Sequence, residues 1–296
     1  FLMGWLVYFS QYFGRYNSAA SMVAIGQQQG WDTARLGLIA SIIFVTYGFG
    51  QLFTGWLGDR LNPKAMIFVG CAGSAGCNLW MGLSGSLFQM QLAWGLNGLL
   101  CALIWAPMVR LMTVYMPEDR LRKAILAFTY ATSLGITGTY LLTSFLISRF
   151  DWRVSFFVPA AIGLAASLGW LAVSFTAGRT PERTPAPVET AKPPEAPRRR
   201  EAFGSIYIRS GLPLLLAAIL LMGLLKDGMM TWVPQMISDT FQVEAYFSIF
   251  LSAALPLVNS LSVWLVSRIG RGHEGDDMRN GALLFAGAIA GMGVLL

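Results

Sequence analysis

Two positively charged residues stand inside long apolar segments, and they are the residues of this chain best suited to binding chemistry. Arg15 interrupts the apolar segment 1–31, and Lys226, followed by Asp227, interrupts the apolar segment 210–238. A charged side chain in mid-membrane costs roughly 2.5–3.5 kcal/mol on insertion scales, so it normally faces a cavity or a partner. The planar fork of arginine fits a carboxylate or phosphate, and lysine offers a compact charge. The pair therefore predicts a binding site for an anion.

The neighbours of Arg15 on the expected helix are polar. Helical spacing places Tyr8, Gln11 and Tyr12 on the side of Arg15, which predicts the wall of a polar cavity. The alternative is a structural lock, in which Arg15 pairs with Asp227, the only acidic residue expected at membrane depth. Asp227 itself has two interpretations: a desolvated carboxylate could take up and release a proton during transport, or it could be the salt partner of a neighbouring cation.

The composition places these residues in a membrane. The chain has 296 residues, of which 55% are hydrophobic and 12% charged, and its mean hydropathy is +0.57. Soluble domains carry about a quarter charged residues. Cys71, Cys77 and Cys101 lie in apolar stretches at a spacing that fits no zinc or iron–sulfur site, and the single histidine, His273, lies in a charged loop. We therefore expect no metal, no cofactor and no enzymatic activity.

Long intervals without charge predict the helices that must position the two cations. A hydrocarbon core about 30 Å thick asks for roughly 20 apolar helical residues. We expect helices at about 2–26, 36–58, 65–83, 88–111, 124–148, 153–176, 209–238 and 245–267, with a partial helix from about 281. This pattern predicts an all-α polytopic membrane protein with a six-helix N-terminal half (1–176) and about three helices of a C-terminal half (209–296).

The segment 177–208 is rich in proline and arginine, which favours an extended, water-exposed linker between the two halves. Most of the 21 lysine and arginine residues fall on the linker's side of the membrane, and only Arg35, Arg149 and Arg153 fall on the other side. The positive-inside rule then predicts a multi-pass protein of the cell (inner or plasma) membrane with a cytoplasmic linker. The bilayer thus explains the net charge of +6 without a nucleic-acid partner, and we expect a monomer.

The two halves carry similar segments. Trp-Leu-Gly-Asp-Arg at 56–60 is similar to Trp-Leu-Val-Ser-Arg at 264–268, and Arg15 and Lys226 precede these segments at similar distances. The two cations therefore occupy corresponding places in parallel halves, an arrangement found in many secondary transporters.

The segment 55–64, Gly-Trp-Leu-Gly-Asp-Arg-Leu-Asn-Pro-Lys, resembles the loop motif between helices two and three of the major facilitator superfamily. The segments 12–17, 47–50 and 226–234 add a resemblance to its organophosphate antiporter branch, which includes glycerol-3-phosphate and hexose-phosphate transporters. The resemblance implies a major facilitator fold with twelve helices in a complete protein, so we expect a truncated chain that lacks about three. It also implies a gating role at the cytoplasmic side for Gly55, Asp59, Arg60 and Lys64.

The same resemblance implies that basic residues on helices one and seven, here Arg15 and Lys226, hold the phosphate of the substrate. The chain departs from the family pattern at Lys226, where arginine is usual, at Gln51, where a basic residue is usual, and at Thr132, where histidine is usual. With fewer positive charges, a monoanion such as a sugar acid or another carboxylate is an alternative to a phosphate ester.

These observations predict a secondary active transporter that moves a small organic anion by alternating access, as antiport with phosphate or as symport with protons through Asp227. The expected substrate contacts are Arg15, Lys226, Tyr12, Gln11 and Tyr47. The expected partners are the lipid bilayer, the anionic substrate, and phosphate or a proton as the coupling ion. The alternative is a membrane-embedded, transporter-like sensor, because some relatives in this branch detect an external organic anion.

Overall fold

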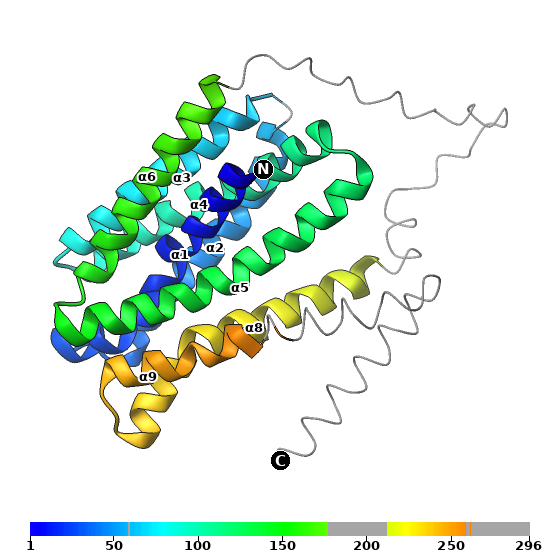
Figure 1. Cartoon of the computed structure of the whole chain (residues 1–296). Coiled ribbons are helices and arrows are strands. Elements are labelled where there is room, and N and C mark those ends of the chain that lie inside the picture. Colours follow the sequence, from blue (N-terminus) through cyan, green and yellow to red (C-terminus); the bar gives the residue numbers. More distant parts are fainter. Residues whose placement is uncertain (59, 177–211, 259–260, 262–296) are drawn as a thin grey trace, which may run out of the picture.

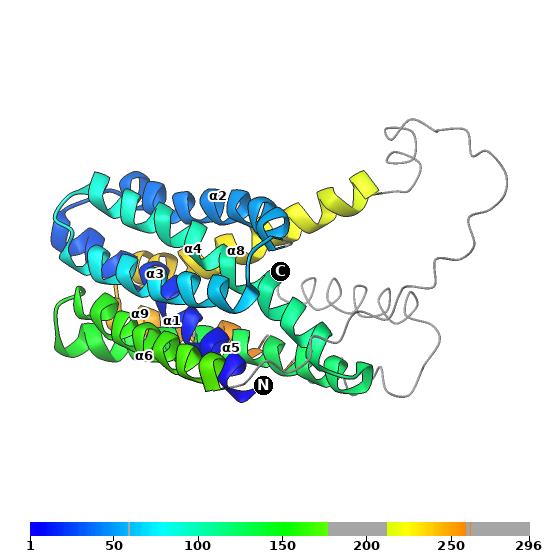
Figure 2. The ribbon, with the colours of Figure 1, turned by 90° about the horizontal axis from the view of Figure 1, so that it is seen from above.

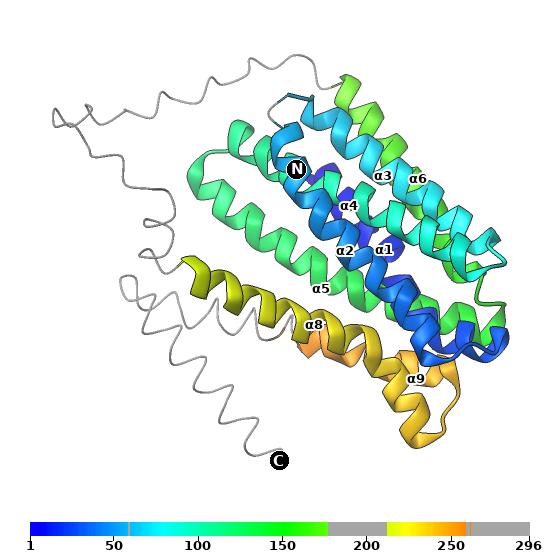
Figure 3. The ribbon, with the colours of Figure 1, turned by 180° about the vertical axis from the view of Figure 1, so that it is seen from behind.

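A computed structural model describes residues 1–58, 60–176, 212–258 and 261, and the regular secondary structure of this part is helical (Figure 1). The helices are α1 (Leu2–Gln29), α2 (Thr33–Gly58), α3 (Pro63–Leu83), α4 (Leu87–Tyr115), α5 (Glu118–Arg149), α6 (Val154–Thr176), α8 (Leu212–Phe241) and α9 (Ala245–Ser252). Helices α1 to α6 form one bundle, and α8 and α9 lie along its α5 side (Figures 1 and 3).

Local sequence explains where several helices begin and end. The side chain of Asn62 accepts a hydrogen bond from the backbone N–H of Lys64, and Pro63 occupies the first turn of α3, where its missing N–H is not needed. Ser86 caps α4 in the same way through the N–H of Gln89. Helix α1 ends at Gly30, whose φ of 65° is favourable for glycine.

Five helices in the described part are long and apolar enough to cross a membrane: Thr33–Gly58, Pro63–Leu83, Leu87–Tyr115, Arg120–Arg149 and Val154–Ser174. Helix α1 has the necessary length but is not one of the five, and its middle carries Gln11, Arg15 and Asn17. Gln11 and Asn17 are buried among neighbouring helices, and Arg15 is half-buried.

Helix α1 occupies the centre of the first six helices. It packs against α5 and α6, while α2 and α3 pack against α4, and α3 also packs against α6. Seen from above, α2 lies along one side of the bundle, and α5 and α6 lie along the other (Figure 2). Gly98 of α4 lets α2 and α4 pack closely, because a Cβ at this position would overlap the side chain of Thr46 in α2. A central α1 can therefore present one face to its own half and another to α8.

The structure confirms the predicted all-helical fold, and its helices match the expected ones with two differences. Helix α5 begins at Glu118 rather than near residue 124, so its first turns carry the charged residues before the apolar interval. The length of a charge-free interval gives only the part of a helix inside the membrane. The helix can continue into water with charged residues, because its backbone hydrogen bonds persist there. Helix α9 ends at Ser252, but after a turn at residue 253 the chain is again helical at 254–258, and most of the rest of the expected helix 245–267 lies outside the described residues. The predicted linker at 177–208 and the helix expected from about residue 281 lie outside the described residues.

Candidate functional site

The guanidinium group of Arg15 lies between helices rather than in lipid. Its carbon Cζ is 3.8 Å from the centre of the Tyr47 ring of α2 and 5.6 Å from the centre of the Tyr16 ring. A cation over an aromatic face is attracted by the negative charge of the ring. No carboxylate oxygen of the described residues lies within ion-pair distance, since the ion pair seen in this part of the chain joins Arg153 to Asp151. Arg15 is thus held by rings and keeps donors for another partner.

Beside Arg15 lies a cavity of about 480 Å³, which is within the usual range of sites for small ligands. Three helices contribute its described walls: Arg15 from α1; Ala40, Ser41, Phe44, Val45 and Tyr47 from α2; and Gly223, Asp227, Gly228, Thr231 and Trp232 from α8. One positive and one negative side chain, three aromatic rings and three hydroxyl groups therefore line one space. This space lies between the N-terminal bundle and α8.

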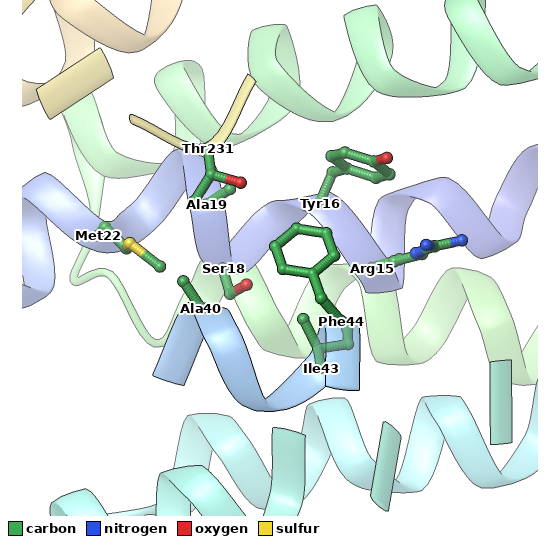
Figure 4. Close-up of a pocket in the computed structure, with 9 residues that line it drawn as sticks. All are labelled: Arg15, Tyr16, Ser18, Ala19, Met22, Ala40, Ile43, Phe44 and Thr231. Carbon is green, nitrogen blue, oxygen red and sulfur yellow. The ribbon is translucent and has the colours of Figure 1, made fainter. Parts of the chain in front are cut away.

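A smaller recess adjoins this cavity, and Figure 4 shows the side chains that line it. The recess and the cavity share Arg15, Ala40, Phe44 and Thr231. In the close-up, the ring of Phe44 lies near Arg15 and Tyr16, and the Thr231 side chain enters from α8 (Figure 4). Sequence patterns did not indicate Phe44 and Tyr16 as residues of the site, because an aromatic residue in an apolar helix gives no signal that separates a cavity wall from a lipid contact.

Asp227 contacts the N-terminal half through a tyrosine and not through Arg15. The hydroxyl of Tyr16 donates to Oδ1 of Asp227 at 3.4 Å, and Tyr16 itself is buried. The direct Arg15–Asp227 lock considered from the sequence is therefore not formed in this conformation. The carboxylate instead lines the cavity that Arg15 also lines. Its role in proton coupling stays a prediction.

Lys226 precedes Asp227 in α8, but its side chain lies outside the described part of the structure. The convergence of Lys226 and Arg15 on one anion therefore stays a prediction. The backbone alone places Lys226 beside a residue of the cavity wall.

Gln11 and Tyr12 face other helices and do not line the cavity. The Gln11 amide donates to the carbonyl of Cys101 in α4 at 3.3 Å. Tyr12 donates to the Tyr8 hydroxyl at 2.9 Å and accepts from Thr132 of α5 at 3.0 Å. Of the residues predicted to bind substrate, the structure thus brings together Arg15 and Tyr47, and it places Gln11 and Tyr12 in contacts within the bundle. Their role as substrate contacts stays a prediction.

The segment predicted to act as a gate lies between α2 and α3, at the end of the bundle that also holds residue 1 (Figure 1). The guanidinium of Arg60 lies 3.9 Å from the Trp56 ring, and the carbonyl of Gly58 accepts a hydrogen bond from Arg110 of α4. The carbonyl of Lys64 accepts from the Trp170 indole of α6 at 2.9 Å. Gly55 has open space beside it, and Asp59 lies outside the described residues. The gating role stays a prediction.

Besides the Tyr16–Asp227 bond, two hydrogen bonds among the described residues join α5 to α8 and α9. The Tyr140 hydroxyl of α5 donates to the carbonyl of Met230 in α8, and Ser144 donates to the carbonyl of Tyr246 in α9 at 2.7 Å. Pro234 explains the first bond: it stands four residues after Met230 and has no N–H, so the Met230 carbonyl has lost its helical partner. Pro234 indicates from the sequence alone that the Met230 carbonyl lacks a helical partner, but the sequence does not reveal that Tyr140 is the donor.

Within the described residues, no group of three or more His, Cys, Asp or Glu side chains could hold a metal ion. Cys71, Cys77 and Cys101 are buried without a disulfide. What the site offers is a guanidinium, a carboxylate, hydroxyl groups and aromatic rings, which suits reversible binding.

Comparisons with known proteins agree with this architecture. The family model described as Major Facilitator Superfamily matches residues 4–296. A protein of Chlamydia pneumoniae named "Probable hexose phosphate transport protein" is 29% identical over 163 residues, which are 54% of this chain and 35% of that protein. "Membrane sensor protein UhpC" of Salmonella typhimurium is 28% identical over 171 residues, which are 56% of this chain and 38% of that protein. The chain thus spans little more than a third of these curated relatives.

Among solved structures, a bacterial homologue of the human lysosomal transporter Spinster, in an inward-facing and unoccupied conformation, is similar with a TM-score of 0.71. The match has 16% sequence identity and covers 92% of this chain and 62% of that one. At this identity the likeness concerns the fold alone. It confirms the predicted arrangement of membrane helices, and the relatives confirm the resemblance stated from the sequence motifs.

Proposed function

The chain belongs to the Major Facilitator Superfamily, and from that premise we propose that it serves a secondary transporter that moves a small organic anion across the membrane by alternating access. Members of this family are transporters and not enzymes, and they are multi-pass membrane proteins. We further propose that the membrane is the cell (inner or plasma) membrane, that the linker is cytoplasmic and that the protein is a monomer.

One observation carries the proposal: Arg15 stands on the wall of the cavity without a carboxylate partner among the described residues. A permanently charged group at this depth needs compensation, because leaving it unpaired is costly. Tyr47 covers one face of the guanidinium, and such stacking leaves the N–H groups at its edge directed sideways. These donors suit two oxygens of a carboxylate or phosphate, which an arginine binds as a planar fork.

The substrate we propose is a small organic anion, either a phosphate ester or a carboxylate such as a sugar acid. Asp227, which lines the same cavity, opposes a high negative charge on the substrate, whereas its oxygens can accept hydrogen bonds from hydroxyl groups of the substrate. Thr132 is engaged with Tyr12 and adds no positive charge. Lys226 supplies the second cation of the proposal, from α8. A substrate with one anionic end and hydroxyl groups at the other would match this distribution.

The coupling mechanism is antiport with phosphate or symport with protons. An antiporter needs one anion site that is filled alternately from the two sides, while a symporter needs a group that binds and releases a proton. Asp227 lines the cavity and accepts from Tyr16, so it is the residue proposed for that task. Asp227→Asn separates the two cases: proton-driven uptake should fail in this variant, whereas exchange of one anion for another should persist.

Uptake of a labelled phosphate ester by the full-length protein in liposomes tests the proposal. Unlabelled phosphate esters and sugar acids should each reduce this uptake if one cavity accepts both anionic groups. Lys226→Ala should reduce uptake more than Lys226→Arg, which keeps the positive charge. An equal loss in both variants would instead indicate that Lys226 acts in packing, and uptake unaffected by any of these anions would contradict the proposed substrate class.

A transporter-like sensor is the second candidate, and the similarity to "Membrane sensor protein UhpC" favours it. Such a protein would bind the anion in the same cavity but would not release it on the other side. Equilibrium binding and flux on one preparation separate the candidates: saturable binding without uptake or exchange identifies a sensor.

A further inference from the structure

A cluster of buried amides lies on the side of α1 that faces away from the cavity. Asn78 of α3 and Asn97 of α4 both donate from Nδ2 to the carbonyl oxygen of Gly14, at 2.8 and 2.9 Å. We call these two bonds the Gly14 clamp. Both asparagines have an exposed fraction of 0%. The carbonyl belongs to the residue directly before Arg15, so the clamp holds α1 at the level of the candidate anion site.

The clamp depends on a glycine. A Cβ at position 14 would lie 2.8 Å from Nδ2 of Asn78, closer than real Cβ contacts. Any side chain at this position would therefore push the amide away from the carbonyl. Because Gly14 has no side chain, the Asn78 amide of α3 can come close enough to the backbone of α1 to donate to the Gly14 carbonyl.

Further bonds fix how the two amides are oriented. Asn17 of α1 donates to Oδ1 of Asn78 at 2.8 Å, and Ser74 donates to Oδ1 of Asn97 at 2.7 Å. With both oxygens accepting, each amide must direct its NH₂ group to Gly14. The bonds therefore form one network in which neither amide can flip without losing two partners.

Helix α6 completes the network through a proline. Pro159 stands four residues after Ser155 and has no N–H, so the carbonyl of Ser155 lacks its helical partner. Asn17 donates to this carbonyl at 3.0 Å, and the hydroxyl groups of Ser21 and Ser155 lie 2.7 Å apart. Helix α1 is thus bonded to α3, α4 and α6 through the Gly14 carbonyl and the side chains of Asn17 and Ser21.

We propose that Asn78 and Asn97 are positioning residues for Arg15: they fix the rotation of α1 and so direct the guanidinium to Tyr47 and the cavity. Successive residues of an α-helix differ by about 100° in direction, so holding Gly14 toward α3 and α4 sets the direction of residue 15. A buried amide without its partner is costly, so a rotated α1 would lose several bonds together. The consequence for anion binding rests on the proposed function, but the orientation of residue 15 does not.

The test measures the direction of position 15 without using a substrate. Arg15→Cys is introduced into the full-length chain with Cys71, Cys77 and Cys101 replaced by serine, and a charged methanethiosulfonate reagent labels the purified protein in detergent. Asn78→Leu and Asn97→Leu should each slow labelling of the new cysteine about tenfold, because losing a buried hydrogen bond lets α1 rotate. Thr139→Val is the matched control, since buried Thr139 donates to Gly135 of its own helix, and it should leave the rate unchanged.

Gly14→Ala tests the clamp if a leucine variant fails to fold. The added Cβ displaces the Asn78 amide from the carbonyl, while Asn78 and Asn97 themselves are kept. It should also slow labelling. Unchanged labelling rates in the folded clamp variants, with a lower melting temperature, would overturn the proposal and leave the network a purely stabilising role. Failure of the anion site would leave the labelling difference intact, whereas failure of the clamp would leave anion binding by the parent protein intact.

Discussion

At the scale of single residues, the account depends on how Arg15 is held. A guanidinium that pairs with a carboxylate is satisfied and has little affinity left for a substrate, whereas one held by aromatic rings keeps its hydrogen-bond donors. In this structure the rings of Tyr47 and Tyr16 take the place of a counter-ion. Arg15 is thus held by aromatic rings and keeps hydrogen-bond donors for the anion that we propose it binds.

Tyr47 should contribute through its ring and not through its hydroxyl group. Tyr47→Ala should weaken anion binding by about 0.5–2 kcal/mol, roughly 2- to 30-fold in Kd, because the guanidinium loses the face on which it is stacked. Tyr47→Phe is the matched control and should bind nearly as well as the parent. Calorimetric titration of the full-length protein measures both, and an equal loss in Tyr47→Phe would indicate that the hydroxyl contacts the substrate instead.

The sequence predicted the central residue of the site but not most of its surroundings. The membrane cost of a charge is a property of one residue, so Arg15 could be recognised without coordinates. Helical spacing gives the direction of a side chain but not its neighbour, and Gln11 and Tyr12 turned out to face α4 and α5. The residues that surround Arg15 come from α2 and α8, which sequence spacing along α1 cannot reveal.

At the scale of helices, the prolines of α6 and α8 have a common effect. Each removes the donor for a carbonyl one turn earlier, and a side chain from another helix takes the vacant acceptor: Asn17 at Ser155 and Tyr140 at Met230. The first bond lies inside the N-terminal half, but the second joins the two halves. If the halves move relative to each other as proposed, we expect the second bond to break and the first to persist.

The bond from Tyr140 should favour the conformation described here. Tyr140→Phe removes one hydrogen bond, worth about 0.5–1.5 kcal/mol net, and should shift the population away from this conformation roughly 2- to 10-fold. Spin labels on α5 and α9 report the change as a longer distance. Pro234→Ala supplies the missing N–H to Met230, so Tyr140→Phe should have a smaller effect in that background. Equal effects in both backgrounds would contradict the role given to the proline.

The turn between α5 and α6 should make stability depend on pH. Burial raises the pKa of Asp151, but the N–H of Arg153, the Gln28 amide and the Arg153 charge outweigh it, so this pKa lies below its usual range. The stabilisation is fully present above the unfolded-state pKa of about 3.9, and it is lost as pH falls through the lower folded-state value. Asp151→Asn should lower the melting temperature at pH 7 but not in strong acid. A difference independent of pH would contradict this.

At the scale of the whole molecule, the broad architecture could be predicted from the sequence, and the contacts between halves could not. Charge-free intervals and the distribution of lysine and arginine are properties of long segments, so they indicated membrane helices reliably. The cavity arises where α1, α2 and α8 meet, and its existence depends on how far apart the halves lie. Contacts between distant helices leave no periodicity in the sequence, although Pro234 marks one of them, the bond from Tyr140 to Met230.

Replacing Arg15 in the full-length protein provides the most direct measurement of the central claim. Equilibrium binding of a phosphate ester and a sugar acid is compared for the parent, Arg15→Ala and Arg15→Lys, with helix content checked by circular dichroism. We expect Arg15→Ala to abolish binding of every anion that the parent binds, and Arg15→Lys to keep weak binding through its charge without the planar fork. Undiminished binding in a folded Arg15→Ala protein would contradict the account.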